Sequence, residues 1–570
     1  MHNIYPIRGV DLLYFCILRN VLKYSIFYSI NLRFNYMNNL RFLQILCSAL
    51  LPVSVYGISK SDKPNILILT ADDLGWNDIS SPLTTSYANS KNHQTPNIDR
   101  LISNGMAFTN AYTQQNSAPT RAALLTGQYA VHNGVYNVTS LARYGNKKKG
   151  GITKQQARII PPKQNGAIDS GTITFAEVLE DGGYQTYIFG KVHGWGGDLS
   201  GHGFTHDFSC SKTVNMKGEK LSNYLAYQTQ EGGWIFDNEV YNKYASPYTE
   251  EYIKKNLIPV ANGNDPMTLV GKRKHFTDAI GDCVIDQLAT VDKNTPFCMW
   301  VCFHAIHSAI VGREDLISKY KQRKDKDNRH RNPDYAALTE QLDQTVGRIM
   351  TALNDPNGDG DTSDSMIDNT IVMFMSDNGG VGGSHSNAPL RGAKGMFYEG
   401  GIRVPMCVTY PKMIKPRTIK DEPVHVIDYY PTLVELAGLE IPSSEKHLLD
   451  GESFVKLLNN PDAELDREAI YWYFPGYMDN RLVPSLMINK RVGDKRYKLK
   501  YSYETETYEL YCLTDDISEK NDLMKSSNKE YINIARNLRD DFCGWLENNP
   551  PLLMKYRNTG NVVGFPILIK

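Results

Sequence analysis

Residues 65–73 read NILILTADD, an apolar run that ends abruptly in two aspartates, Asp72 and Asp73. An apolar run without alternation is typical of a strand that is buried on both faces of a parallel sheet. Three later runs have the same character and also lead into polar residues: QTYIFG (185–190) before Lys191 and His193, PFCMWVCF (296–303) before His304 and His307, and TIVMFMS (370–376) before Asp377 and Asn378. Together the four runs predict the central strands of one sheet.

Helical patterns lie between these runs. The segment 95–105 has a threonine cap, a proline start and a glycine stop, and 174–183 follows the same logic. From Asp334 to Leu353, apolar residues recur every three or four positions and form one stripe. Alternating strands and helices build βαβ units, so we expect an α/β fold with a large, mostly parallel, doubly wound sheet flanked by helices.

The chain changes character after about residue 440. The stretches 467–476 and 487–513, which together are rich in Tyr and Lys, are typical of antiparallel strands, and a helix is expected near 528–546. We therefore predict a main domain at 63–445 and a smaller C-terminal α/β domain, with an antiparallel sheet, at 446–570.

The first 57 residues are expected to be a leader. Residues 37–57 carry a basic residue at Arg41, an apolar run and small residues at the end, which resembles a secretory signal peptide. We expect translation to begin at Met37 and the mature protein to be periplasmic or secreted, with no membrane segment. A buried helix or an unusual membrane anchor is the alternative interpretation of this region.

Composition limits the classes of partner. The chain has 570 residues, 41% of them hydrophobic, which is ample for a sizeable core. Lys+Arg and Asp+Glu are equal at 62 each, so no global field favours nucleic acid or an anionic membrane. Seven cysteines follow the leader without a C-x-x-C pair, and Cys298, Cys302 and Cys407 are expected to be buried.

Oxygen donors follow two of the predicted strands, and ligands of open α/β sheets bind beyond the carboxyl ends of the strands. Asp72, Asp73, Asp377 and Asn378 suit a hard divalent cation, Ca²⁺ before Mg²⁺. A cation would also offset the repulsion among three crowded carboxylates. The alternative, that Asp72 and Asp377 only cap helices, does not account for two adjacent aspartates.

Cationic and histidine side chains are expected at the same edge of the sheet. Arg121, Lys191 and Lys394 can offset the charge of a bound anion and of a leaving oxygen. His193 and His307 are candidate acid–base groups. Separately, residues 355–366 resemble the beginning of an EF-hand loop but have Met at the twelfth position, so we interpret them as a polar surface loop, with a second calcium site as a side hypothesis.

The stretch NSAPTRAALLTG (116–127) predicts a helix. Pro119 suits the first helical position and Gly127 suits the stop, so Ser117 is expected just before the helix N-terminus, where an anion is favoured. Taken alone, an ordinary Ser/Pro helix start explains the stretch equally well.

Taken together, these stretches resemble the formylglycine-dependent sulfatases of the arylsulfatase type, in the alkaline-phosphatase-like superfamily. SAPTRAALLTG (117–127) is similar to the family signature. Further stretches resemble the family in its own order: NILILTADDLG (65–75), GKVH (190–193), FHAIH (303–307), SDNGG (376–380), PLRGAKGMFYEGGIRVP (389–405) and VIDYYPTLVELAG (426–438). Ile306 departs from the family's usual proline, so His304 competes with His307 for its role.

The resemblance implies that a maturation enzyme of the radical type found in bacteria oxidises Ser117 to formylglycine (3-oxoalanine). One hydroxyl of its hydrate would attack sulfur, and loss of the second proton, with His193 as base, would expel sulfate. Arg121 and Lys191 would hold the hydrate, and His307 and Lys394 would bind the sulfate. The metal ligands would be Asp72, Asp73, Ser117, Asp377 and Asn378.

The expected activity is hydrolysis of sulfate monoesters, first on sulfated polysaccharide fragments. Aryl or choline sulfates, phosphomonoesters or phosphonate esters, and sulfoglycan binding without catalysis are the alternatives. Aromatic and polar residues that could contact a sugar are Trp195, His202, His206, Trp234, Phe236, His385, Asn387 and Arg403.

Overall fold

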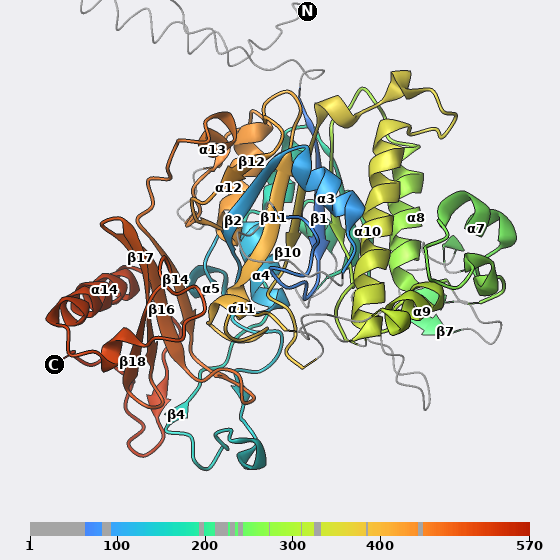
Figure 1. Ribbon diagram of the computed structural model, residues 1–570. Coiled ribbons are helices and arrows are strands. Elements are labelled where there is room, and N and C mark those ends of the chain that lie inside the picture. Colours follow the sequence, from blue (N-terminus) through green and yellow to red (C-terminus); the bar gives the residue numbers. More distant parts are fainter. Residues whose placement is uncertain are drawn as a thin grey trace, which may run out of the picture. The chain divides into compact units, whose positions relative to one another are not determined.

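A nine-stranded sheet lies at the centre of the fold, in the order β12-β2-β11-β10-β1-β9-β5-β6, with β13 paired to β2 (Figure 1). The computed structural model describes residues 63–82, 93–192, 199–210, 226–228, 234–236, 243–244, 246–272, 274–308, 310–323, 332–383, 386–442 and 448–569. The strands are β1 (Asn65–Ala71), β2 (Met106–Tyr112), β5 (Gln185–Lys191), β6 (His206–Cys210), β9 (Phe297–Cys302), β10 (Thr370–Ser376), β11 (Arg403–Thr409), β12 (Thr418–Lys420) and β13 (Val424–His425).

The middle of this sheet is parallel. Strand β1 pairs in parallel with β10 on one side and β9 on the other, so that Leu67 lies between Val372 and Met299. Strand β5 continues the parallel order next to β9, whereas β11 runs antiparallel to both β10 and β2. The four apolar runs are therefore the four adjacent central strands, as predicted, and the mostly parallel α/β fold is confirmed.

Helices cover both faces of the sheet, which explains why the strands lack alternation. Leu67 and Leu69 point into one hydrophobic cluster, which α3 (Pro96–Ser103), α8 (Phe276–Leu288) and α10 (Pro333–Asn354) share. Ile66 and Ile68 point into the other, which α4 (Ser117–Thr126), α6 (Phe175–Asp181) and α12 (Tyr429–Leu436) share. Further helices are α5 (Ala130–Asn133), α7 (Glu250–Asn256), α9 (Glu314–Gln322), α11 (Glu399–Ile402) and α13 (Val455–Asn459).

The predicted C-terminal sheet is antiparallel, in the order β14-β16-β17-β18. Its strands are β14 (Ala469–Phe474), β16 (Ser485–Val492), β17 (Lys495–Ser502) and β18 (Thr507–Cys512), and α14 (Lys529–Asn548) packs against it. Strand pairs also join β3 (Ala142–Arg143) to β15 (Tyr477–Met478), β4 (Ile159–Ile160) to β19 (Lys555–Tyr556), and β7 (Ala226–Gln228) to β8 (Trp234–Phe236). The division at 445/446 stays a prediction.

The prediction that three cysteines are buried is confirmed. Cys298, Cys302 and Cys407 are free and buried, in strands of the central sheet. Within the described ranges, every helix is too short or too polar to cross a membrane. The leader, with Met37, lies outside the described residues.

Candidate active site

The carboxyl ends of β1, β9 and β10 are tied together beyond the strands themselves. The amide of Asp72 donates to the Ala305 carbonyl oxygen at 2.8 Å, and the amide of Asp377 donates to the Ala71 carbonyl oxygen at 3.0 Å. The Ile306 amide in turn donates to the Asp72 carbonyl oxygen, a bond that a proline in its place could not make. These backbone bonds fix the polar residues that follow the strands.

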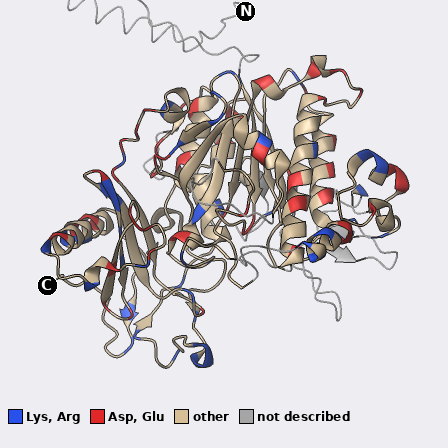
Figure 2. Cartoon of the chain, viewed as in Figure 1, with Lys and Arg blue, Asp and Glu red and all other residues tan. Residues whose placement is uncertain are grey.

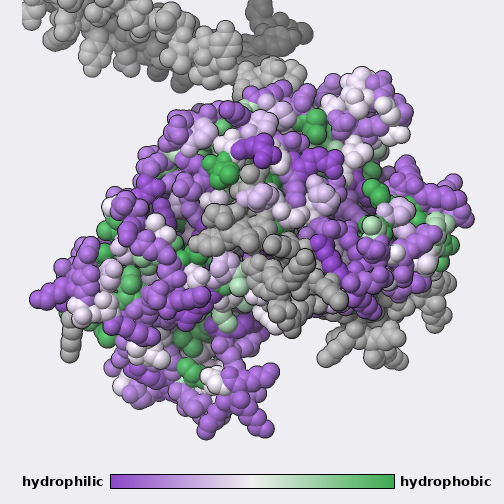
Figure 3. Space-filling view, viewed as in Figure 1, coloured by the Kyte–Doolittle hydropathy of each residue, from purple (hydrophilic) through white to green (hydrophobic). Residues whose placement is uncertain are grey.

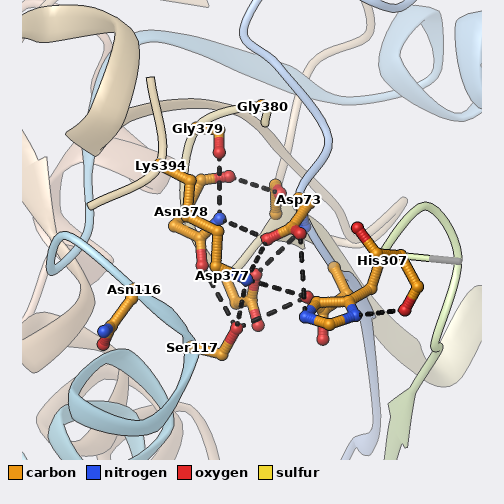
Figure 4. A network of polar contacts seen from close by, with 12 residues as sticks. Asp73, Asn116, Ser117, His307, Asp377, Asn378, Gly379, Gly380 and Lys394 are labelled. Atoms are coloured by element: carbon orange, nitrogen blue, oxygen red, sulfur yellow. Dashed lines mark hydrogen bonds and ion pairs between the residues drawn. The ribbon is translucent and has the colours of Figure 1, made fainter. Parts of the chain in front are cut away.

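The four predicted oxygen donors meet at this edge and are all buried. Figure 4 shows three of them, Asp73, Asp377 and Asn378, close together. Asn378 Nδ2 donates to Asp73 Oδ1 at 2.7 Å, and the Asp73 amide lies 3.3 Å from Asp377 Oδ1. Asp73 has a φ of 63°, in the left-handed region that an ordinary residue rarely adopts. Such strain persists where surrounding contacts hold it and is common at functional sites.

Ser117 lies in the same cluster, although it comes from α4. Its Oγ is 3.2 Å from Asn378 Oδ1, 3.4 Å from Asp72 Oδ1 and 3.4 Å from Lys394 Nζ. The helix begins earlier than predicted, because Asn116 precedes it and Ser117 is its first residue. Pro119 therefore occupies the third helical position, where its missing N–H is still one that no intrahelical carbonyl would accept.

The three predicted cations surround the carboxylates. Arg121 NH2 lies 2.8 Å from Asp377 Oδ2 and 3.2 Å from Asp72 Oδ2, while its NH1 donates to the Lys191 carbonyl oxygen. Lys191 Nζ pairs with Asp72 Oδ2, and Lys394 Nζ lies 2.5 Å from Asp73 Oδ1. Arg121 thus orients two carboxylates and also holds the end of β5.

The carboxylates of the cluster have features that suit a bound divalent cation. Burial raises the pKa of Asp72, but Lys191 and the other cations outweigh burial and hold that pKa well below its usual value. Burial raises the pKa of Asp73 and of Asp377, and the nearby positive charges do not reverse this. Asp73 Oδ2 is buried and accepts no hydrogen bond from the described residues. A divalent cation would favour the ionised form of both carboxylates and would give Asp73 Oδ2 a partner.

His307 faces the cluster from the loop after β9. Its Nε2 lies 3.9 Å from Asp73 Oδ2, and its ring can join Asp72 and Asp73 in holding a metal ion. Its Nδ1 donates to the Ser308 carbonyl oxygen at 2.7 Å, because a carbonyl can only accept; Nε2 is then the acceptor nitrogen of the neutral ring. Burial and the charges of Lys191 and Lys394 lower the pKa of His307 to about 3, so the ring is neutral near pH 7.

His304, the competing histidine, is buried beside His307, with ring centroids 5.8 Å apart. Burial lowers its pKa well below the ordinary value. Its ring also packs edge-on against Phe276 in the core, with centroids 5.5 Å apart. His304 is therefore more enclosed than His307, whose side chain is 14% exposed. The predicted base His193 lies outside the described residues.

Among the residues that were expected to contact a sugar, Arg403 and Asn387 bind groups of the protein itself. Arg403 donates to Glu399 and stacks on Trp76, and Asn387 Nδ2 donates to the carbonyl oxygens of Gly380 and Gly392, so both side chains brace the protein itself. Trp195, His385 and the side chains of Trp234 and Phe236 lie outside the described residues. In the 355–366 loop, Asp355 accepts from the amides of Gly358 and Gly360, as in an ordinary polar turn.

A tyrosine behind the cluster supports it, and no sequence pattern predicted this contact. Tyr335 of α10 donates to Asp78 Oδ2 at 2.6 Å and lies 3.2 Å from the Asp73 carbonyl oxygen. Asp78 Oδ2 also accepts from the Gly75 amide at 2.7 Å. In the sequence, a tyrosine within an apolar helical stripe indicates a core residue. Only the fold shows that its hydroxyl reaches the turn that carries Asp73.

Comparison with known proteins shows to which class this protein belongs. Residues 64–439 match the family model "Sulfatase", and residues 393–545 match "N-sulphoglucosamine sulphohydrolase, C-terminal". A sulfatase of Formosa agariphila is 42% identical over 521 residues, which cover 89% of this chain and 93% of that protein. The protein is thus a sulfuric ester hydrolase. It belongs to the sulfatase family.

Two solved structures have a fold that is similar to that of this chain. The crystal structure of Ps i-CgsB in complex with k-i-k-neocarrahexaose superposes with a TM-score of 0.61 at 25% identity, over 85% of this chain and 93% of that chain. A structure in complex with its substrate D-glucosamine-2-N,6-O-disulfate superposes with a TM-score of 0.55 at 19% identity, over 85% of this chain and 98% of that chain. The second likeness shows the fold alone.

Proposed function

We propose that this protein is an exported sulfatase that removes sulfate from sulfated carbohydrates, through a formylglycine made from Ser117 and with a bound Ca²⁺. The observation that carries the proposal is the position of the Ser117 hydroxyl, which is within 3.4 Å of Asp72, Asn378 and Lys394. A buried serine that contacts both acidic and cationic groups is suited to modification and to anion chemistry.

Asp72, Asp73, Asp377 and Asn378 would hold the cation, together with residue 117. The cation would supply positive charge next to the sulfate. Four oxygen donors suit a hard cation, and calcium is preferred to magnesium because Ca²⁺ tolerates irregular coordination whereas Mg²⁺ demands a near-ideal octahedron. Counted simply, three carboxylates and three cationic side chains cancel, so the two charges of the metal remain to offset the sulfate ester and the leaving oxygen.

Oxidised residue 117 would supply a hydrated aldehyde, with one hydroxyl to attack sulfur and a second to drive sulfate release. The oxidation removes two hydrogens from the serine and needs an external acceptor, which a maturation enzyme would provide. Lys394 would hold positive charge beside the nucleophile, and Arg121 and Lys191 would fix the carboxylates around it. Neutral His307 would offer Nε2 as a proton acceptor, and this nitrogen would donate to a sulfate oxygen only after it had taken up a proton. His193 remains the proposed base.

Sulfated carbohydrate is the proposed substrate class for two reasons. The structure of Ps i-CgsB, to which this chain is 25% identical, is in complex with k-i-k-neocarrahexaose, and residues 393–545 match the family model "N-sulphoglucosamine sulphohydrolase, C-terminal". The signal-peptide-like residues 37–57 support export to the periplasm or the medium, where such polymers occur.

Mass spectrometry of the peptide 101–121 tests the modification. Protein from the native host should carry this peptide about 2 Da lighter than its serine form. Matured wild-type protein should release sulfate from carrageenan, ulvan, fucoidan or glycosaminoglycan oligosaccharides, whereas Ser117→Ala should not. An unmodified peptide in fully active protein would refute the formylglycine.

Chelation tests the metal. Removal of divalent ions from matured protein should abolish turnover of a chromogenic sulfate, and Ca²⁺ should restore it better than Mg²⁺. Full turnover after thorough chelation would exclude the proposed metal role. The matching chromogenic phosphate serves as control, and preferential hydrolysis of the phosphate would favour the phosphoesterase alternative.

A further inference from the structure

One long part of the sequence contains basic residues but no acidic ones. Lys+Arg and Asp+Glu are equal at 62 each, yet residues 101–168 contain no Asp or Glu. Their cationic residues are Arg121, Arg143, Lys147, Lys148, Lys149, Lys154, Arg158 and Lys163. Figure 2 shows the short helix of Lys147–Lys149 as a blue turn at the lower edge of the molecule. The neutral total therefore conceals a strongly basic segment.

Most of this charge is not neutralised. Arg143 pairs with Asp479 and Arg158 pairs with Glu506, but both pairs are partly exposed. The five lysines of the segment are exposed and form no ion pair with the described residues. Exposed cations without partners produce a local positive field that attracts polyanions.

A cavity of about 820 Å³ lies against the same segment. Lys154, Lys163 and Arg557 line it, and its lining contains no carboxylate among the described residues. Arg557 donates to the carbonyl oxygen of Ala157 and to the Tyr144 hydroxyl, which are neutral acceptors, so its charge stays uncompensated there. This volume lies within the roughly 300–1,000 Å³ that is typical of ligand sites.

The segment has a defined conformation. The Asn480 side chain accepts from the Asn146 amide at 2.8 Å and donates to the Lys149 carbonyl oxygen at 3.0 Å. A Cβ atom at Gly151 would come within 1.9 Å of Asn480 Oδ1, so glycine is required for this contact. The lysines are thus presented by a turn that a side chain from the C-terminal part holds.

The cavity is also connected to the catalytic cluster. Gln164 Oε1 accepts from the amides of Tyr136 and Asn137, and Asn137 Oδ1 accepts from Asn116 Nδ2 at 2.8 Å. Asn116 directly precedes Ser117, and Val138, the residue after Asn137, lines the cavity. The path from Val138 to Ser117 thus consists of two peptide units, each about 3.8 Å long, and of the hydrogen bond between the side chains of Asn137 and Asn116.

We propose that the segment 138–166 and Arg557 form a second binding surface for the sulfated polysaccharide, which holds sulfate groups other than the one at Ser117. This rests on the proposed substrate class. Several exposed lysines spaced along a turn match the repeated single charges of a sulfated glycan, and each contact is weak and screened by salt. The described residues on the face in Figure 3 are mainly hydrophilic, in keeping with a polar ligand.

The test compares two variants that lose the same charge. In the Ser117→Ala background, which cannot turn over substrate, Lys148→Gln, Lys154→Gln and Lys163→Gln are combined. The control combines Lys255→Gln, Lys415→Gln and Lys529→Gln, which are equally exposed lysines elsewhere. Binding of fluorescein-labelled dextran sulfate is measured by anisotropy at low and physiological ionic strength, with uncharged dextran as the blank.

The first variant should bind about tenfold more weakly, with a shallower salt dependence, and the control should match the parent. With Ser117 intact, the first variant should raise KM for a sulfated polysaccharide and leave turnover of a small chromogenic sulfate unchanged. Equal weakening in both variants, no weakening, or equally tight binding of single-stranded DNA would overturn the proposal. If the matured wild type releases no sulfate from any glycan, the proposed function fails, whatever the binding result.

Discussion

Removal of one hydroxyl group behind the acidic cluster should weaken metal binding. In Tyr335→Phe, the Asp73 carbonyl oxygen loses a donor at 3.2 Å and Asp78 Oδ2 loses a donor at 2.6 Å. Asp78 keeps its bond from the Gly75 amide, so the turn should loosen without unfolding. The strained Asp73, with its φ of 63°, should then occupy the metal-binding conformation less often.

The size of the effect follows from the contacts. A hydrogen bond to a charged group contributes about 1.5–3 kcal/mol. If about 1.4 kcal/mol of this loss falls on metal binding, Kd for Ca²⁺ rises about tenfold, which is the lower end of what outer partners of metal ligands contribute. Isothermal titration of the purified, metal-stripped protein with CaCl₂ measures the change directly, without reference to activity.

Tyr429→Phe is the matched control. Tyr429 is equally buried, and its hydroxyl makes no hydrogen bond with the described residues. Its loss should leave Kd for Ca²⁺ within about twofold. Unchanged affinity in Tyr335→Phe, or the same loss in Tyr429→Phe, would refute the idea that this hydroxyl positions Asp73.

Two further predictions concern stability. Burial raises the pKa of Asp343 to about 7, against the amides of Ile98 and Asn97, which lower it. Because the folded state then holds a proton that the unfolded state has lost, Asp343 lowers the free energy of unfolding as pH rises from about 4 to 7. Asp343→Asn should remove about 2–4 kcal/mol of this pH dependence, measured by urea unfolding at pH 5 and pH 8; parallel wild-type and variant profiles would contradict it. Lys498 Nζ lies 3.0 Å from Glu399 Oε1 and 2.8 Å from Glu519 Oε1, with all three side chains buried. Lys498→Met should therefore cost about 3–5 kcal/mol in urea unfolding, and adding Glu519→Gln should recover part of it; a cost below 1 kcal/mol would show that the three charges are not held together.

Local sequence was enough to predict the four central strands, the C-terminal strands and the helices α3, α4, α6, α10 and α14. Residues 66–71 are buried at every position and are apolar except for Thr70, because helices cover both faces of the sheet. The helix around Ser117 was predicted with its glycine stop, but its first residue was not, because proline is acceptable at several positions of a first turn.

The convergence of the site was predictable in part. Asp72 and Asp377 follow adjacent parallel strands, and the carboxyl ends of parallel strands meet at one edge, so their proximity follows from topology. The ion pairs of Arg121 with Asp72 and Asp377 could not be predicted from the topology, because the direction of a side chain on α4 depends on how that helix packs.

Tertiary structure alone decided the contacts that join distant segments. Tyr335 meets the Asp73 carbonyl oxygen across 262 residues of sequence, and Asn480 holds the lysine turn from the C-terminal part. Neither residue belongs to a sequence motif, because the role of a single hydroxyl or amide depends on the group that it contacts. The sequence by itself thus determined which residues could bind a cation and an anion. The packing of α4 and α10 against the strand ends decided which groups hold them there, because those partners are brought together only by long-range packing.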